Sequence, residues 1–157
     1  MIWKFIQQFT KEKILQEKEL LELKFEYVLV SEPLKRIIMS STIKPQTAGL
    51  LLGRQFPNGF VPSVALLQML VPHAERTVTV NDKGAWLFIC ARDLWSESII
   101  DSKGKPEAGQ LVLVCNEHKE CLGVGYVVQK ISARGLVIKN LYDIGWFARK
   151  TVKAIRV

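Results

Sequence analysis

Residues 121–128 have the sequence Cys-Leu-Gly-Val-Gly-Tyr-Val-Val, and residues 140–145 have the sequence Asn-Leu-Tyr-Asp-Ile-Gly. The β-branched and aromatic residues of the first stretch predict a β-strand. A dinucleotide-binding loop would need a helix directly after its glycines, whereas Val127 and Val128 continue the strand pattern. We therefore interpret Gly123 and Gly125 as sites of close backbone approach or of a β-bulge.

Further short runs with strand composition surround this stretch, and turn signals separate them. These runs are Thr77–Val80, Trp86–Ile89, Leu111–Cys115, Leu122–Gln129 and Leu136–Lys139. Several short strands at this spacing predict a small antiparallel barrel or sandwich. Trp86 and Phe88 alternate within one of the runs, which predicts that they pack into the core.

The first half of the chain alternates helical and strand patterns instead. The expected elements are a helix within Phe5–Leu23 that begins at Thr10 if Thr10 is its N-cap, a strand at Phe25–Val30, a helix at Glu32–Met39, a strand at Gly49–Phe56 and a helix at Pro62–Val71. The pattern changes near Pro72–Glu75. The sequence thus predicts an α+β protein, with an N-terminal α/β sandwich-like domain at residues 1–74 and a C-terminal small mixed β-barrel at residues 75–157.

The composition is that of a globular protein with an anionic partner. The chain has 157 residues, 48% hydrophobic and 24% charged, which excludes disorder, collagen and coiled coil and allows a real core. The formal net charge is +7. Residues 1–75 hold 9 basic and 7 acidic side chains, a net of +2, and residues 76–157 hold 13 and 8, a net of +5. This basic excess favours an anionic partner, either nucleic acid or an acidic membrane surface. We expect the C-terminal part of the chain to bind that partner.

Several classes of protein are not expected. No apolar run approaches the ~20 residues of a membrane span, and Met1–Phe5 lacks a signal-peptide pattern. We therefore expect an intracellular protein that does not contact a membrane. The sequence has no nucleophile-elbow, zincin or phosphate-loop motif, so we expect no enzyme, no catalytic residue and no cofactor.

Cys115, His118 and Cys121 have a spacing that is reminiscent of a metal site. A structural zinc site normally has four ligands, and this segment offers three, so we predict no metal. The odd number of three cysteines argues against a secreted disulfide framework. Two alternatives stay open for Cys115 and Cys121, which are a disulfide across the hairpin or two ordinary buried thiols.

The stretch from Arg76 to about Lys150 resembles a PUA domain, an RNA-binding fold. The similar segments are Val78–Asn81, Trp86–Leu94, Ala108–Val114, Cys121–Tyr126 and Asn140–Gly145. The chain departs from the general pattern at Cys90-Ala91, where many PUA domains have a glycine in the loop that approaches RNA. The resemblance therefore implies the fold, while the usual RNA-contacting loop is in doubt.

The N-terminal half adds a second likeness. Tyr27–Glu32, Gly49–Gly53, Leu70–Ala74 and Asp143-Ile144-Gly145 are similar to the Nip-seven family of large-subunit ribosome biogenesis factors. The short N-terminus is more similar to archaeal members, which implies a cytoplasmic location, or a nucleolar one in a eukaryote. The resemblance further implies a monomer that binds a precursor of ribosomal RNA, single-stranded or U-rich. Its N-terminal domain would bind ribosome assembly factors or exosome-linked proteins.

The candidate RNA-binding residues are basic and lie toward the C-terminus. Arg149, Lys150, Lys153 and Arg156 share one face if this segment is helical, and such a stripe can follow a phosphate backbone. A solvated basic face or a terminal strand is the alternative. Trp146 beside the stripe is a candidate for base stacking. Three further candidates surround the turn before the last strand, namely Lys130, Arg134 and Lys139.

Two other functions remain possible on the sequence alone. The first is an accessory protein of RNA modification that contains a PUA domain, which predicts a nucleoside or methyl-donor pocket in the N-terminal domain. The second is a protein-interaction module whose basic tail binds an acidic protein.

Overall fold

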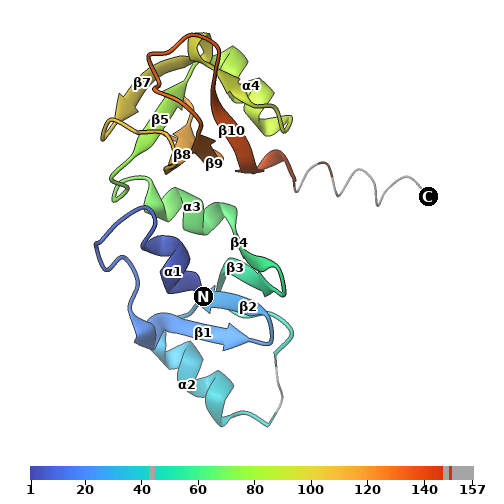
Figure 1. The fold of residues 1–157 in the computed structure, drawn as a ribbon. Coiled ribbons are helices and arrows are strands. Elements are labelled where there is room, and N and C mark those ends of the chain that lie inside the picture. Colours follow the sequence, from blue (N-terminus) through green and yellow to red (C-terminus); the bar gives the residue numbers. More distant parts are fainter. Residues whose placement is uncertain (43–44, 147–148, 150–157) are drawn as a thin grey trace, which may run out of the picture. The chain divides into compact units, whose positions relative to one another are not determined.

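The computed structural model describes residues 1–42, 45–146 and 149. The chain divides into two compact units, Met1–His73 and Ala74–Val157. Figure 1 shows the elements of both units along the chain. Among the described residues no helix has the length and apolar character needed to cross a membrane.

The N-terminal unit contains one four-stranded antiparallel sheet with the strand order β1-β2-β3-β4. Its elements are α1 (Ile2–Ile6), the 3-10 turn η1 (Glu17–Glu19), β1 (Leu20–Leu23), β2 (Glu26–Leu29), α2 (Glu32–Ser40), β3 (Leu50–Phe56), β4 (Gly59–Pro62) and α3 (Val64–Leu70). Helix α3 packs against β3, and Ser63 caps it by accepting a hydrogen bond from the Leu66 backbone N–H. The buried side chains come from several elements, among them Ile2, Ile6, Leu52, Leu66, Leu67 and Leu70.

The helix predicted within Phe5–Leu23 is wrong over most of its length. Helix α1 covers only Ile2–Ile6, and Leu20–Leu23 forms β1 in register with Glu26–Leu29. Thr10 is buried and accepts a hydrogen bond from the Glu12 N–H at 3.0 Å, so it orders a turn where a helix cap was expected. Cross-strand pairing here overrides the local helix propensity.

The C-terminal unit contains a curled six-stranded sheet with the order β6-β10-β9-β8-β5-β7 (Figure 1). Its elements are β5 (Thr77–Val80), α4 (Asp82–Ile89), β6 (Leu94–Trp95), the 3-10 turn η2 (Ser96–Ser98), β7 (Ile99–Lys103), β8 (Leu111–Cys115), β9 (Cys121–Val127) and β10 (Leu136–Asp143). The β5–β8 pair is parallel and the other pairs are antiparallel. Both units combine helices with a β-sheet, which confirms the predicted α+β class.

The glycine-containing stretch lies at the centre of this sheet, as β9. Gly125 is paired with Val112 on one side and Asn140 on the other. A Cβ atom at Gly125 would collide with Ile138 Cγ2 and would lie 3.2 Å from Val114 Cγ2. Glycine therefore lets two core side chains approach the strand backbone, as the sequence predicted.

The strand expected at Trp86–Ile89 is wrong, because this segment is part of helix α4. Asn81 is the N-cap, and its side chain accepts a hydrogen bond from the Gly84 N–H at 2.8 Å. Gly84 and Phe88 lie one helical turn apart and are buried, whereas Trp86 lies on the outer side and is 65% exposed. The prediction that Trp86 packs into the core is therefore wrong, and the prediction for Phe88 is confirmed.

Helix α4 ends in a Schellman motif that has alanine in place of the usual glycine. The Arg92 N–H donates to the Leu87 carbonyl at 3.0 Å, and the Ala91 N–H donates to the Phe88 carbonyl at 3.0 Å. Ala91 has a φ of 63°, in the left-handed region. This conformation costs an L-residue with a Cβ atom about 1–2 kcal/mol.

Ala91→Gly is expected to stabilise the protein by about 0.5–1 kcal/mol. Glycine has no Cβ atom and so relieves the strain of the left-handed conformation, but its more flexible unfolded chain offsets part of that gain. Urea unfolding followed by circular dichroism measures the change. Ala85→Gly, within the same helix, is the matched control and should destabilise by about 1 kcal/mol. Equal destabilisation by both substitutions would contradict this account of the cap.

Candidate nucleic-acid interface

A cluster of hydrogen bonds joins the end of β10 to the end of α4. The Asp143 side chain is 4% exposed, and its two carboxylate oxygens each accept a hydrogen bond from the Arg149 guanidinium at 2.9 Å. Nη1 of Arg149 also donates to the backbone carbonyl oxygen of Ile89 in α4. A buried carboxylate needs such a partner, because an unpaired charge in the interior is strongly unfavourable. We call these three groups the Arg149 node.

Two further residues of the C-terminal unit complete the junction. A Cβ atom at Gly145 would collide with the Ile89 carbonyl oxygen and would lie 2.9 Å from Nη1 of Arg149, so glycine is needed there. Asn140 of β10 donates from Nδ2 to the Phe88 carbonyl oxygen at 2.7 Å. Arg149 thus satisfies the Ile89 carbonyl at the end of α4, and Asn140 adds a second donor to the Phe88 carbonyl, which also accepts from the Ala91 N–H.

The node also fixes the charge of Arg149. Hydrogen bonding to the Asp143 carboxylate raises the pKa of Arg149 above its ordinary value, so the guanidinium stays protonated. A cation next to the last carbonyls of a helix is favourable with respect to the helix dipole. The geometry therefore gives Arg149 a structural role in this unit, although its side chain remains 40% exposed.

A double-mutant cycle with Asp143→Ala and Arg149→Ala should give a coupling free energy of about 1–2 kcal/mol, because the pair is bidentate and its Asp143 partner is buried while Arg149 is partly exposed. Each single variant should lower the free energy of unfolding in urea. The double variant should be little less stable than the worse single variant. If the two losses add within about 0.5 kcal/mol, the node does not couple these groups.

With α4 held in this way, one side of the helix presents an aromatic ring to solvent. Lys83, Trp86 and Cys90 follow one another at helical spacing, and all three are exposed. Arg92 is exposed directly after the Schellman motif. An exposed indole with cations in the same segment is suited to stack on an unpaired base while the cations contact phosphates. Asn81 is a typical N-cap residue and was the sequence signal for helix α4. The alternation of Trp86 and Phe88, which is typical of a strand, obscured that signal.

A second exposed tryptophan lies beside the loop that precedes β10. Trp95, which is 54% exposed, is the register partner of Leu136, and the Ser96 N–H donates to the Gly135 carbonyl at 2.9 Å. Gln129 orders this loop by donating from Nε2 to the carbonyl oxygens of Arg134 at 3.1 Å and Leu136 at 2.7 Å. The predicted residues Lys130 and Arg134 are exposed in the same loop. The structure thus places two predicted cations in the loop that adjoins Trp95.

The third predicted cation of this region lies elsewhere on the sheet. Lys139 of β10 is exposed and is the register partner of Tyr126 in β9, which is also exposed. Its neighbour Asn140 reaches the end of α4. Because successive residues of a strand point to opposite faces, Lys139 lies on the face away from α4.

The remaining predictions concern the C-terminal segment. Trp146 is half-buried and interacts with neighbouring groups. Lys150, Lys153 and Arg156 lie outside the described residues. Their role as phosphate contacts stays a prediction, as does base stacking by Trp146.

The cysteine pair proves to be two buried thiols. Cys115 and Cys121 are register partners across the β8–β9 hairpin, and no disulfide joins them. Their thiols hydrogen-bond to each other, which lowers the pKa of Cys115 and raises that of Cys121. Among the described residues, no group of three or more His, Cys, Asp or Glu side chains is placed to hold a metal ion.

Tyr142 should make stability fall at high pH. Burial, and next the charge of Asp143, raise the pKa of Tyr142 from 10.0 to about 12. The unfolded tyrosine ionises first, so stability is lost as the pH rises from about 10 through about 12. Urea unfolding across this range should show a smaller loss for Tyr142→Phe than for the wild type. Tyr126→Phe, on the exposed sheet face, is the control, and an equal effect of both variants would contradict the assignment.

Comparisons with known proteins agree with this architecture. The family model described as the UPF0113 PUA domain matches residues 76–152. This segment has the fold of a PUA domain. A UPF0113 protein of Aeropyrum pernix is 28% identical over 107 residues, which cover 66% of this chain and 58% of the relative. The chain therefore matches less than two thirds of that relative's length.

Solved structures share the fold over most of the chain. A conserved PUA domain protein from Thermoplasma acidophilum superposes with a TM-score of 0.60 at 17% identity, over 92% of this chain and 87% of that one. A PUA domain protein from Aeropyrum pernix, solved with tartrate, gives 0.58 at 12% identity, over 92% and 82%. A hypothetical protein from Pyrococcus horikoshii gives 0.56 at 17% identity, over 99% and 92%. At these identities the likeness establishes the fold alone.

Proposed function

We propose that the protein is a non-catalytic RNA-binding factor that acts in assembly of the large ribosomal subunit. The observation that carries RNA binding is the PUA domain at residues 76–152. Its described surface bears two exposed tryptophans, Trp86 and Trp95, each with cations nearby in the sequence or in an adjoining loop. Stacking on such rings tolerates any base and suits single-stranded RNA, including a U-rich precursor of ribosomal RNA.

The charge distribution supports the same assignment. The segment from residue 76 to residue 157 holds 13 basic and 8 acidic side chains, a net of +5 out of the total of +7. Basic side chains supply the part of RNA affinity that depends on salt, and they fix the position of the backbone rather than the sequence that is bound. The structural role of Arg149 leaves Lys150, Lys153 and Arg156 as the tail residues proposed to contact phosphate.

The place in ribosome assembly rests on the resemblance of both halves of the chain to the Nip-seven family. In this proposal the protein is a monomer. The N-terminal unit binds ribosome assembly factors or exosome-linked proteins, and the PUA domain holds the precursor RNA. The site of action would be the cytoplasm of an archaeon.

RNA binding is best tested by fluorescence anisotropy with a labelled U-rich single strand across a salt series. The variant Lys150→Ala/Lys153→Ala/Arg156→Ala should lower the log–log salt slope by about 2, at ~0.7 per phosphate contact. Trp86→Ala should weaken binding by about 1–3 kcal/mol with little change of slope. Arg149 is left intact, because its removal would disturb the node. Competition by large-subunit and small-subunit rRNA transcripts then measures preference for the large-subunit precursor.

The matched control is Lys4→Ala/Lys11→Ala/Lys13→Ala, which removes the same charge from the N-terminal unit. This control should keep the wild-type slope. An absence of binding at low salt would refute RNA binding. An equal loss with the control would place the contacts outside the PUA domain, and equal competition by both rRNAs would refute the large-subunit role.

A further inference from the structure

Helix α2 is attached to its unit along only one side. None of its nine residues is buried. The Lys35 ammonium donates to the backbone carbonyl oxygens of Glu17 at 3.1 Å and of Leu20 at 2.8 Å, which ties the helix to η1 and the start of β1. The rest of the helix surface is open, and it carries apolar side chains that folding leaves in water.

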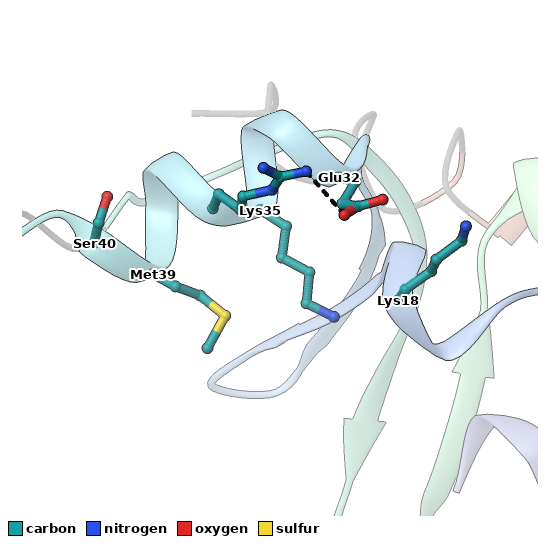
Figure 2. Close-up of a pocket in the computed structure, with 6 residues that line it drawn as sticks. Lys18, Glu32, Lys35, Met39 and Ser40 are labelled. Carbon is teal, nitrogen blue, oxygen red and sulfur yellow. Dashed lines mark hydrogen bonds and ion pairs between the residues drawn. The ribbon is translucent and has the colours of Figure 1, made fainter.

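A hollow of about 460 Å³ lies between α2 and η1 (Figure 2). It is lined by Lys18 of η1 and by Glu32, Lys35, Arg36, Met39 and Ser40 of α2. Figure 2 shows that Lys35 and Met39 extend from the same side of α2. Met39 is 72% exposed, so its apolar side chain is open to contact by a partner.

The charges around the hollow are unbalanced. Three cations, Lys18, Lys35 and Arg36, line it with a single carboxylate. That carboxylate, Glu32, accepts a hydrogen bond from Arg36 at 2.9 Å, and both side chains are more than half exposed. Such a surface pair contributes only about 0–1 kcal/mol, so a carboxylate from outside can displace Glu32 at little cost. No aromatic ring is among the six lining residues, so the hollow offers no platform for a base.

We propose that this hollow docks an acidic segment of a protein partner. Carboxylates of the partner would pair with Lys18 and Arg36, and an apolar side chain next to them would pack on Met39, whose flexible thioether adapts to different partners. The proposal rests on the binding of protein partners by the N-terminal unit, for which it names a surface and a chemistry. It does not depend on RNA binding by the PUA domain.

The test uses the full-length protein with ¹³C-methyl methionine, without RNA. The chain has three methionines, Met1, Met39 and Met69, and Met39→Leu identifies the Met39 signal. The probe is a short synthetic peptide of Asp and Glu residues around a central Leu-Phe pair. Titration with the peptide should shift the Met39 methyl signal to saturation and leave the Met69 signal in place. The same peptide with Lys in place of the acids should cause no shift.

Variants then separate the hollow from the rest of α2 by anisotropy of the labelled peptide. Lys18→Glu/Arg36→Glu should weaken binding by about tenfold or more. Met39→Ser should weaken binding, whereas Ile37→Ser should leave it unchanged. Ile37 is 64% exposed, but at ~100° per residue it lies about 200° from Met39 around the helix.

Three outcomes would overturn the docking proposal. They are no shift of the Met39 signal at millimolar peptide, an equal loss with Ile37→Ser, and a shift of the Met39 signal by U-rich RNA in place of the peptide. All three outcomes concern the hollow beside α2, so the proposed RNA binding of the PUA domain is tested separately by the salt series.

Discussion

The C-terminal unit depends on one charge that has to be neutralised. Asp143 ends the last described strand with its carboxylate in the interior, and Arg149 supplies a bidentate partner. The same guanidinium satisfies the Ile89 carbonyl of α4, so one side chain compensates a buried anion and a helix end together. This explains why glycine stands at position 145, where a side chain would occupy the space of the node. It also fixes α4 against β10, and in that orientation the outer side of the helix presents Trp86 to solvent.

Among the described residues, the surface of this unit combines exposed rings and cations from several elements. Trp86 lies on α4 one turn after the exposed Lys83, while Trp95 lies beside the loop that holds Lys130 and Arg134. Lys139 is on the sheet face away from α4, next to Tyr126. Two stacking rings with cations around them suit a flexible single strand better than a rigid duplex, because each base can turn onto a ring independently. In the N-terminal unit, the hollow beside α2 has cations without rings, a chemistry that suits a peptide.

Much of the fold could be predicted from sequence, and the failures have physical causes. The strands around Gly125 and the helices after Ser31 and Ser63 were predictable, because their local patterns agree with their final contacts. Thr10 has the side chain of a helix cap, but pairing of Leu20–Leu23 with β2 outweighs the helix propensity that follows it. Trp86 alternates with Phe88 as in a strand, and only the Asn81 cap indicates the helix. The role of Arg149 could not be predicted, because its partners lie 6 and 60 residues away and meet only in the folded unit.

RNA contact at the outer side of α4 is the central claim, and the indole N–H signals of the four tryptophans test it most directly. We would record these signals by ¹⁵N NMR on the full-length protein during titration with a U-rich single strand, with Trp86→Phe to assign the decisive peak. The account predicts that the Trp86 signal shifts and saturates with the RNA, while the Trp3 signal in the N-terminal unit stays in place. A saturating RNA titration in which the Trp86 signal does not move would contradict it.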